Sequence, residues 1–159
     1  MTPALLVEAV AKEIEAATST YKLKAENQAD KKMSVYRQHF PNEDFEDDSY
    51  YPLVIVSWQG CEDKEDGSEA TIGLTVGVYG HDKAAWMDLL SVMERIRQRL
   101  LIFRILERRY RLIMPTKFET IESQPYPYWF GYATLKYQIG QPSEQMAKDW
   151  GRIMEEDNV

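Results

Sequence analysis

The stretch Ser123–Ile139, SQPYPYWFGYATLKYQI, constrains the fold most strongly, because a strand here would carry apolar residues on both faces. Successive side chains of a strand point to opposite faces of the sheet. One face would hold Trp129 and further apolar residues to the end of the strand, so we expect Trp129 in the core. On the other face, the side chains are aromatic at the start of the strand and polar at its end. We therefore expect Tyr126, Tyr128 and Phe130 to be covered by a helix of the same chain or by an adjacent subunit, since aromatic rings are favoured at interface cores.

Length and composition are those of one globular domain. The chain has 159 residues, of which 44% are hydrophobic and 28% charged, enough to bury a proper core. We expect a single domain over residues 1–159, with a loop-rich insertion at 19–49 and a peripheral C-terminal helix at 142–156. No apolar run reaches the roughly 18 residues that would span a bilayer, and the N-terminus lacks the pattern of a secretion signal. The single Cys61 excludes an internal disulfide and fits a reducing compartment.

Hydrophobic periodicity predicts three helices and five strands. The first helix is expected at 3–18, and a main amphipathic helix follows Asp82. The last helix would place Met146, Trp150 and Ile153 on one face. Strands are expected at 53–56, 71–79, 108–114, 117–123 and 128–139. These elements predict an α+β fold: a small, mostly antiparallel sheet flanked by helices, with the long amphipathic helix across one face.

Two details of this prediction concern packing. The buried stripe of the main helix is expected to consist of Trp86, Leu89, Met93, Ile96, Leu100 and Phe103. The strands at 53–56 and 71–79 are expected to form an antiparallel hairpin, joined by a charged connection at 61–70. Gly73 and Gly77 share one face of the second strand, where they leave a groove for a closely packed neighbour.

Charge is distributed unevenly along the chain. The net charge is −7, which argues against a general phosphate-binding surface. The charged residues in 43–69 are almost all acidic and include Asp47 and Asp48, whereas residues 95–111 contain seven arginines and one glutamate. One interpretation is two solvated faces. The other is a pair of complementary surfaces that meet between copies, for which Arg95, Arg99 and Arg108 are the candidate basic residues.

The residue types needed for catalysis are sparse. His39 and His81 lie far apart in sequence, so neither belongs to a zinc-type pair. Cys61 stands beside carboxylates that disfavour a thiolate. The segment that includes Lys64 does not fit a calcium-binding loop, because lysine occupies a ligand position. We expect no catalytic site, no metal and no cofactor. An enzyme that uses loop carboxylates remains a rival hypothesis.

Three segments together resemble a known family. YPLVIVSWQGCEDKEDGSEATIGLTVGVYGHD, MDLLSVMERIRQRLL and QPYPYWFGYATLKYQI occur in this order over residues 50–140. They resemble the tail terminator, or tail completion, proteins of long-tailed bacteriophages, which similarly have a proline-led apolar strand, an acidic loop, a helix and a closing QPYPYWFG strand. His81 and Asp82 stand where an acidic pair is expected.

The resemblance implies a structural protein of the virion, assembled in the host cytoplasm, that forms a homohexameric ring. The ring would cap the tail tube, contact the tail tube protein and a head-side neck protein, and pass DNA without binding it specifically; no membrane is implied. Carboxylates on an inner wall repel phosphates, so the acidic hairpin tip is expected to face the lumen or an axial partner. Its residues are Glu62, Asp63, Glu65 and Asp66. The rival functions are a head-closure adaptor of the same neck and a non-viral peptide-binding module.

Overall fold

The computed structural model describes residues 2–20, 22–23, 31–41, 44–82 and 84–145. It contains two α-helices, one 3-10 helix and eight strands in these residues. In chain order they are α1 (Thr2–Thr18), β1 (Lys22–Leu23), β2 (Lys31–Lys32), β3 (Ser34–Arg37), η1 (Asp48–Tyr50), β4 (Leu53–Lys64), β5 (Gly67–Tyr79), α2 (Ala85–Ile102), β6 (Ile105–Leu106), β7 (Tyr110–Thr120) and β8 (Tyr128–Ile139).

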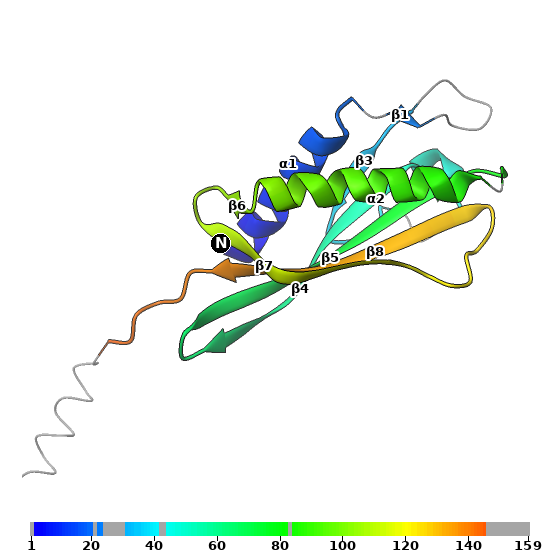
Figure 1. Ribbon diagram of the computed structural model, residues 1–159. Coiled ribbons are helices and arrows are strands. Elements are labelled where there is room, and N and C mark those ends of the chain that lie inside the picture. Colours follow the sequence, from blue (N-terminus) through cyan, green and yellow to red (C-terminus); the bar gives the residue numbers. More distant parts are fainter. Residues whose placement is uncertain (1, 21, 24–30, 42–43, 83, 146–159) are drawn as a thin grey trace, which may run out of the picture.

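Six of the strands form one curled sheet, in the order β3-β4-β5-β8-β7-β6 (Figure 1). The pair β3–β4 is parallel and the other four pairs are antiparallel. The long hairpin β4–β5 extends beyond the helices, and β8 lies between β5 and β7. The chain therefore brings its closing strand into the middle of the sheet.

The predicted fold class was wrong. The structure is mostly sheet, with 43% of residues in strands, and the six strands form a mixed, curled half-barrel with two helices. The stretch 61–70, predicted as a connection, continues both strands of the hairpin, because backbone pairing accepts exposed charged side chains as readily as apolar ones. Residues 110–120 form one strand with an irregularity between Ile113 and Lys117, where Pro115 has no N–H to donate.

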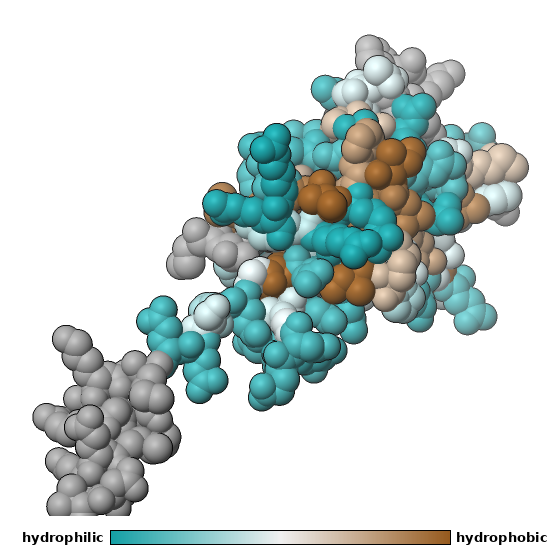
Figure 2. Space-filling model, turned by 60° about the vertical axis from the view of Figure 1, so that its left-hand side comes forward, coloured by the Kyte–Doolittle hydropathy of each residue, from teal (hydrophilic) through white to brown (hydrophobic). Residues whose placement is uncertain are grey.

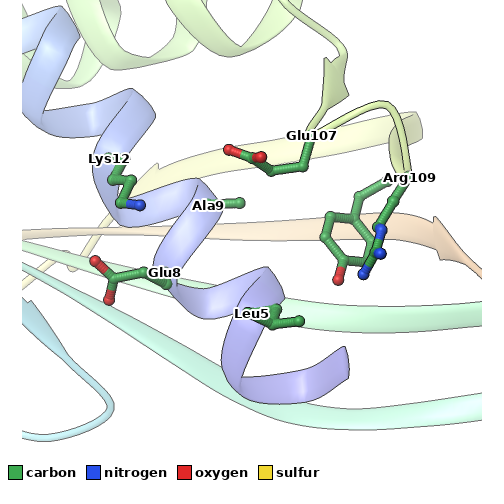
Figure 3. A pocket seen from close by; sticks show the side chains of 7 residues that line it. Leu5, Glu8, Ala9, Lys12, Glu107 and Arg109 are labelled. Carbon is green, nitrogen blue, oxygen red and sulfur yellow. The ribbon is translucent and has the colours of Figure 1, made fainter. Parts of the chain in front are cut away.

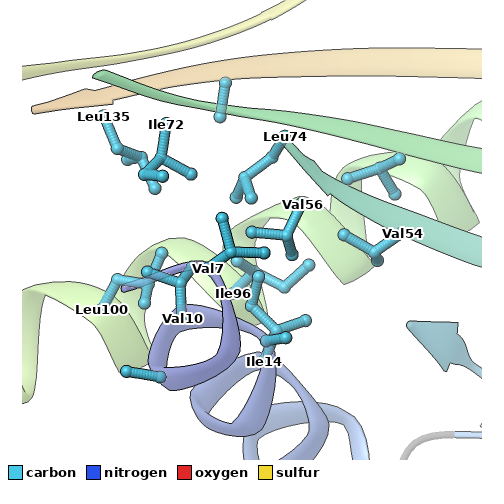
Figure 4. Packing of buried hydrophobic residues seen from close by; sticks show 14 of the residues in the cluster. Val7, Val10, Ile14, Val54, Val56, Ile72, Leu74, Ile96, Leu100 and Leu135 are labelled. Atoms are coloured by element: carbon cyan, nitrogen blue, oxygen red, sulfur yellow. The ribbon is translucent and has the colours of Figure 1, made fainter. Parts of the chain in front are cut away.

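The main core lies between one face of the sheet and both helices (Figure 4). The predicted helix at 3–18 is confirmed by α1, which buries Leu6, Val10 and Ile14 at a spacing of four residues. These side chains meet residues of α2, β4, β5 and β8. The residues are Val54, Val56, Ile72, Leu74, Leu89, Ile96, Leu100 and Leu135.

Two of the residues predicted on the buried stripe of α2 lie outside it. Trp86 and Phe103 are both exposed, because the buried positions start at Ala85 and continue to Leu100. Trp86 lies in the first turn of the helix, about 100° around from Ala85 and at the edge of this stripe. Phe103 follows the last helical residue, and the Arg99 guanidinium lies 4.2 Å from the centre of its ring.

Candidate assembly surface

A second, aromatic cluster covers part of the opposite face of the sheet. It consists of Tyr36, Phe40, Tyr50, Tyr51, Leu53, Ile55, Tyr79, Tyr128 and Phe130. The Tyr51 ring lies 5.0 Å from the Tyr128 ring and 6.0 Å from the Phe130 ring, between centroids. Tyr51 also fills the space above Gly77, because a Cβ added to Gly77 would lie 2.7 Å from the Cε1 atom of Tyr51. The groove predicted at this glycine is therefore occupied by a ring of the same chain.

The cover over the aromatic face of β8 is the segment 44–51, which includes η1, and not the main helix α2. The Tyr128 hydroxyl donates to the carbonyl oxygen of Glu46, and the Tyr51 hydroxyl donates to that of Phe45 at 2.7 Å. Burial raises the pKa of both tyrosines. Tyr128 is buried, Phe130 is half-buried and Trp129 packs partly buried against the main core. A role of these aromatics in contacts between subunits stays a prediction.

Tyr126 lies where two of the resembling segments meet, the one that ends at residue 82 and the one that begins at residue 124. Its hydroxyl donates to the carbonyl oxygen of His81 at 2.6 Å. Gly80 N donates to the carbonyl oxygen of Pro127 at 3.0 Å, and Trp129 Nε1 donates to that of Gly80 at 3.0 Å. These bonds join residues 77–82 to residues 124–131, and Tyr126 remains 52% exposed.

The predicted acidic partners lie in the segment that covers β8. Asp47 caps η1, since its Oδ1 atom accepts from Ser49 N at 3.0 Å and from Ser49 Oγ at 2.6 Å. Asp48 is the first residue of η1 and is exposed. Asp47 therefore has a structural role within the chain, and Asp48 is presented to solvent.

The predicted basic partners differ in how they are held. Arg99 is paired within the chain, with its Nε atom 2.5 Å from Glu13 Oε1. Arg95 lies on the exposed side of α2 and donates to Thr20 Oγ1 at 3.4 Å. Arg108 stands in the turn between β6 and β7, at a φ of 55°, and makes no ion pair with any residue that the structure describes.

The acidic tip of the β4–β5 hairpin is exposed at Glu62, Asp63, Glu65 and Asp66. Asp63 Oδ1 accepts from the Ser68 hydroxyl at 2.6 Å. One surface hollow is lined both by Asp66 and Glu69 of the hairpin and by Arg104 and Arg111. Part of the acidic segment thus faces part of the arginine segment within one chain. Contact between these segments across copies stays a prediction.

A hollow of mixed charge lies between α1 and the β6–β7 turn (Figure 3). Glu8 and Lys12 line it from α1, and Glu107 and Arg109 from the turn. Because both signs are present on both sides, the hollow does not favour an anion or a cation.

The exposed large hydrophobic residues were largely missed by the sequence analysis. Several hydrophobic side chains lie next to one another on the surface, bordered by hydrophilic ones (Figure 2). Met87 and Leu90 lie on the outer side of α2, and Ile102 and Ile105 lie at its end and just beyond. For the helical residues the signal was present in the sequence, since Met87, Leu90 and Ile102 fall outside the helical spacing of the buried stripe.

The groups that could support chemistry lie on the surface. His39, His81 and Cys61 are exposed. Within the described ranges, no group of three or more His, Cys, Asp and Glu residues could hold a metal ion. None of the helices in the same ranges has the length and apolar character of a membrane span. The predicted contact residues Met146, Trp150 and Ile153 lie outside the described residues.

No family model matches the sequence, and no curated protein matches it. Among solved structures, the chain is similar to a chain from the virion of a native gene transfer agent particle, with 12% sequence identity and a TM-score of 0.39. The alignment covers 84% of this chain and 93% of the other. A likeness at this TM-score does not define a shared fold or function.

Proposed function

We propose that this chain is a structural protein of a phage neck, a tail terminator. Six copies form a ring that caps the tail tube and joins it to the head. The ring contacts the tail tube protein on one side and a head-side neck protein on the other, and DNA passes through it without specific binding. The proposed role is that of a virion component without catalytic activity.

The observation that carries the proposal is the junction between residues 77–82 and residues 124–131. Both belong to segments that resemble tail terminators, of which QPYPYWFG is the more specific, and they are far apart in the sequence. Three hydrogen bonds hold them together beside the first turn of α2. The resembling segments therefore build one feature of the surface, with the exposed Tyr126 at its edge. Exposed aromatic and apolar side chains next to such a feature favour contact with other proteins.

The proposal places the acidic hairpin tip at the lumen of the ring. Glu62, Glu65 and Asp66 are exposed at the end of a hairpin that extends past the helices (Figure 1). Carboxylates repel DNA phosphates, so a tip facing the lumen would let the duplex slide. A structure of the ring with this tip on its outer rim would exclude that placement.

Binding of the purified chain to isolated phage parts tests the proposal against its nearest rival. In negative-stain images, we expect ring-shaped density on the ends of tail tubes that lack a cap. Tubes that already carry a cap serve as the control and should bind none. Density on portal-bearing heads alone would favour the head-closure adaptor and contradict the terminator role.

A further inference from the structure

We propose that the first turns of α2 in one copy bind the region just after α2 in the next copy, so that neighbouring subunits are joined head to tail. We define the first-turn patch as Trp86, Met87, Asp88 and Leu90. We define the arginine patch as Arg99, Ile102, Phe103, Ile105 and Arg108. The inference rests on the proposed function, because it assigns the surface through which copies of a ring would meet.

The first-turn patch is apolar and carries a carboxylate. Trp86, Met87 and Leu90 are 45%, 53% and 45% exposed. Leu90 lies four residues after Trp86 and three after Met87, which places the three side chains on neighbouring rows of the helix surface. Asp88 belongs to the same turns but lies about 100° around the helix from Met87, and it makes no ion pair with any described residue. Burial, and next the negative charge of Asp82, raise the pKa of Asp88.

The arginine patch is apolar and carries guanidinium groups. Ile102 and Ile105 are 71% and 62% exposed, the highest values among the large hydrophobic residues of the described ranges. Phe103 lies beside them beneath the Arg99 guanidinium. Arg108 extends from the adjacent β6–β7 turn, where Arg109 N donates to the Leu106 carbonyl oxygen at 3.0 Å.

The two patches lie at opposite ends of one rigid element. α2 has 18 residues, which corresponds to a length of about 27 Å. One molecule cannot bring its own two patches together. The first-turn patch of one copy can, however, contact the arginine patch of a neighbouring copy. A contact of this type is heterologous, and it generates a ring when the rotation between subunits closes.

Charge complementarity favours a second copy of the chain as the partner that binds these patches. Residues 81–94 contain three carboxylates and one lysine, whereas residues 95–111 contain seven arginines and one carboxylate. The first-turn patch offers an indole ring, which binds guanidinium groups by cation–π attraction. The arginine patch offers those groups together with branched aliphatic side chains. Tryptophan, methionine and arginine are also enriched at interface cores.

Mixing two variants of the full chain tests the inference. Leu90→Arg brings a positive charge toward the arginine patch, and Ile102→Glu brings a negative charge toward the carboxylate of the first-turn patch. We expect the wild-type chain to associate in sedimentation experiments and each variant alone to be monomeric. An equimolar mixture of the two should form dimers and nothing larger, because it retains one intact pair of patches.

Met114→Glu is the matched control, since Met114 is an exposed apolar residue on β7, away from both patches, and this variant should associate like the wild type. At a concentration where the wild-type chain is monomeric, circular dichroism melts should be unchanged for all three variants, because the replaced side chains are exposed.

Four results would overturn the inference. The first three are a wild-type chain that stays monomeric at every concentration, either patch variant associating like the wild type, and a mixture that remains monomeric. Loss of association only on removal of residues 146–159 would assign the contact to that segment and also overturn it. The binding experiment with tail tubes is read independently, so these results do not decide whether the chain is a terminator.

Discussion

At the scale of single residues, the turn between β6 and β7 contains two non-glycine residues whose backbone lies in the left-handed region. Glu107 and Arg108 have φ angles of 53° and 55°. This conformation costs such a residue about 1–2 kcal/mol. We predict that Arg108→Gly stabilises the monomer by about 1 kcal/mol in urea unfolding. The same change should weaken association between copies, because it removes a guanidinium from the arginine patch.

Arg109→Gly is the control for this prediction. Arg109 belongs to the same turn but lies outside the left-handed region. Its replacement removes an arginine without relieving backbone strain, so it should not stabilise the monomer. An equal gain in stability from both variants would contradict the explanation by strain.

The ion pair between α1 and β3 makes a second residue-scale prediction. The Arg37 guanidinium donates to both carboxylate oxygens of Glu8, at 3.1 Å and 2.9 Å, and this hydrogen bonding lowers the pKa of Glu8 below its ordinary value. A carboxyl group whose pKa is lower in the folded chain stabilises the fold above its unfolded pKa. This stabilisation disappears as the pH falls through the folded pKa.

Glu8→Gln should therefore lower the free energy of unfolding at neutral pH and have little effect in strong acid. Both side chains are partly exposed, so we expect a cost below about 1 kcal/mol at pH 7. Urea unfolding at several pH values measures it, with Glu122→Gln as an exposed control. A cost that stays constant down to the acid limit would show that Glu8 acts through packing.

At the scale of secondary-structure elements, the two faces of β5 are packed by different parts of the chain. Gly77 makes room for Tyr51, which joins the segment 44–51 to the sheet. A Cβ at this position would lie 2.7 Å from Tyr51 and 3.0 Å from Phe130. We predict that Gly77→Ala destabilises the fold by about 1–3 kcal/mol in thermal or urea unfolding. Gly140→Ala has open space around it and should be close to neutral; a similar loss at both glycines would refute the role of close packing.

Periodicity was sufficient to predict most elements and insufficient at their ends. α1, the antiparallel pairing of β4 with β5, and the aromatic strand β8 followed from spacing and alternation. The prediction failed where strands carry exposed charge, as in residues 61–70, because an extended hairpin needs no apolar face. It also failed for Trp86, which is exposed although its size favours the core, because it lies in the first turn of α2 at the edge of the buried stripe.

At the scale of the whole molecule, the arrangement of the strands was not predictable from local patterns. The parallel pairing of β3 with β4 depends on residues far outside the hairpin, such as Gln38, whose side chain bonds both Trp58 N and the Trp58 carbonyl oxygen. The aromatic face of β8 was recognised as needing cover. The identity of that cover was missed, because Phe45 and Tyr51 lie in a stretch that is mainly acidic.

The central claim, that this chain ends the growth of a tail tube and offers a surface to the head, is tested most directly by electron microscopy of lysates from a phage that lacks it. A stack of identical rings continues only while each new face repeats the last, so a cap with two different faces stops it. We predict DNA-filled heads, unattached tails and a fraction of overlong tubes. Normal-length tails attached to heads would contradict the claim.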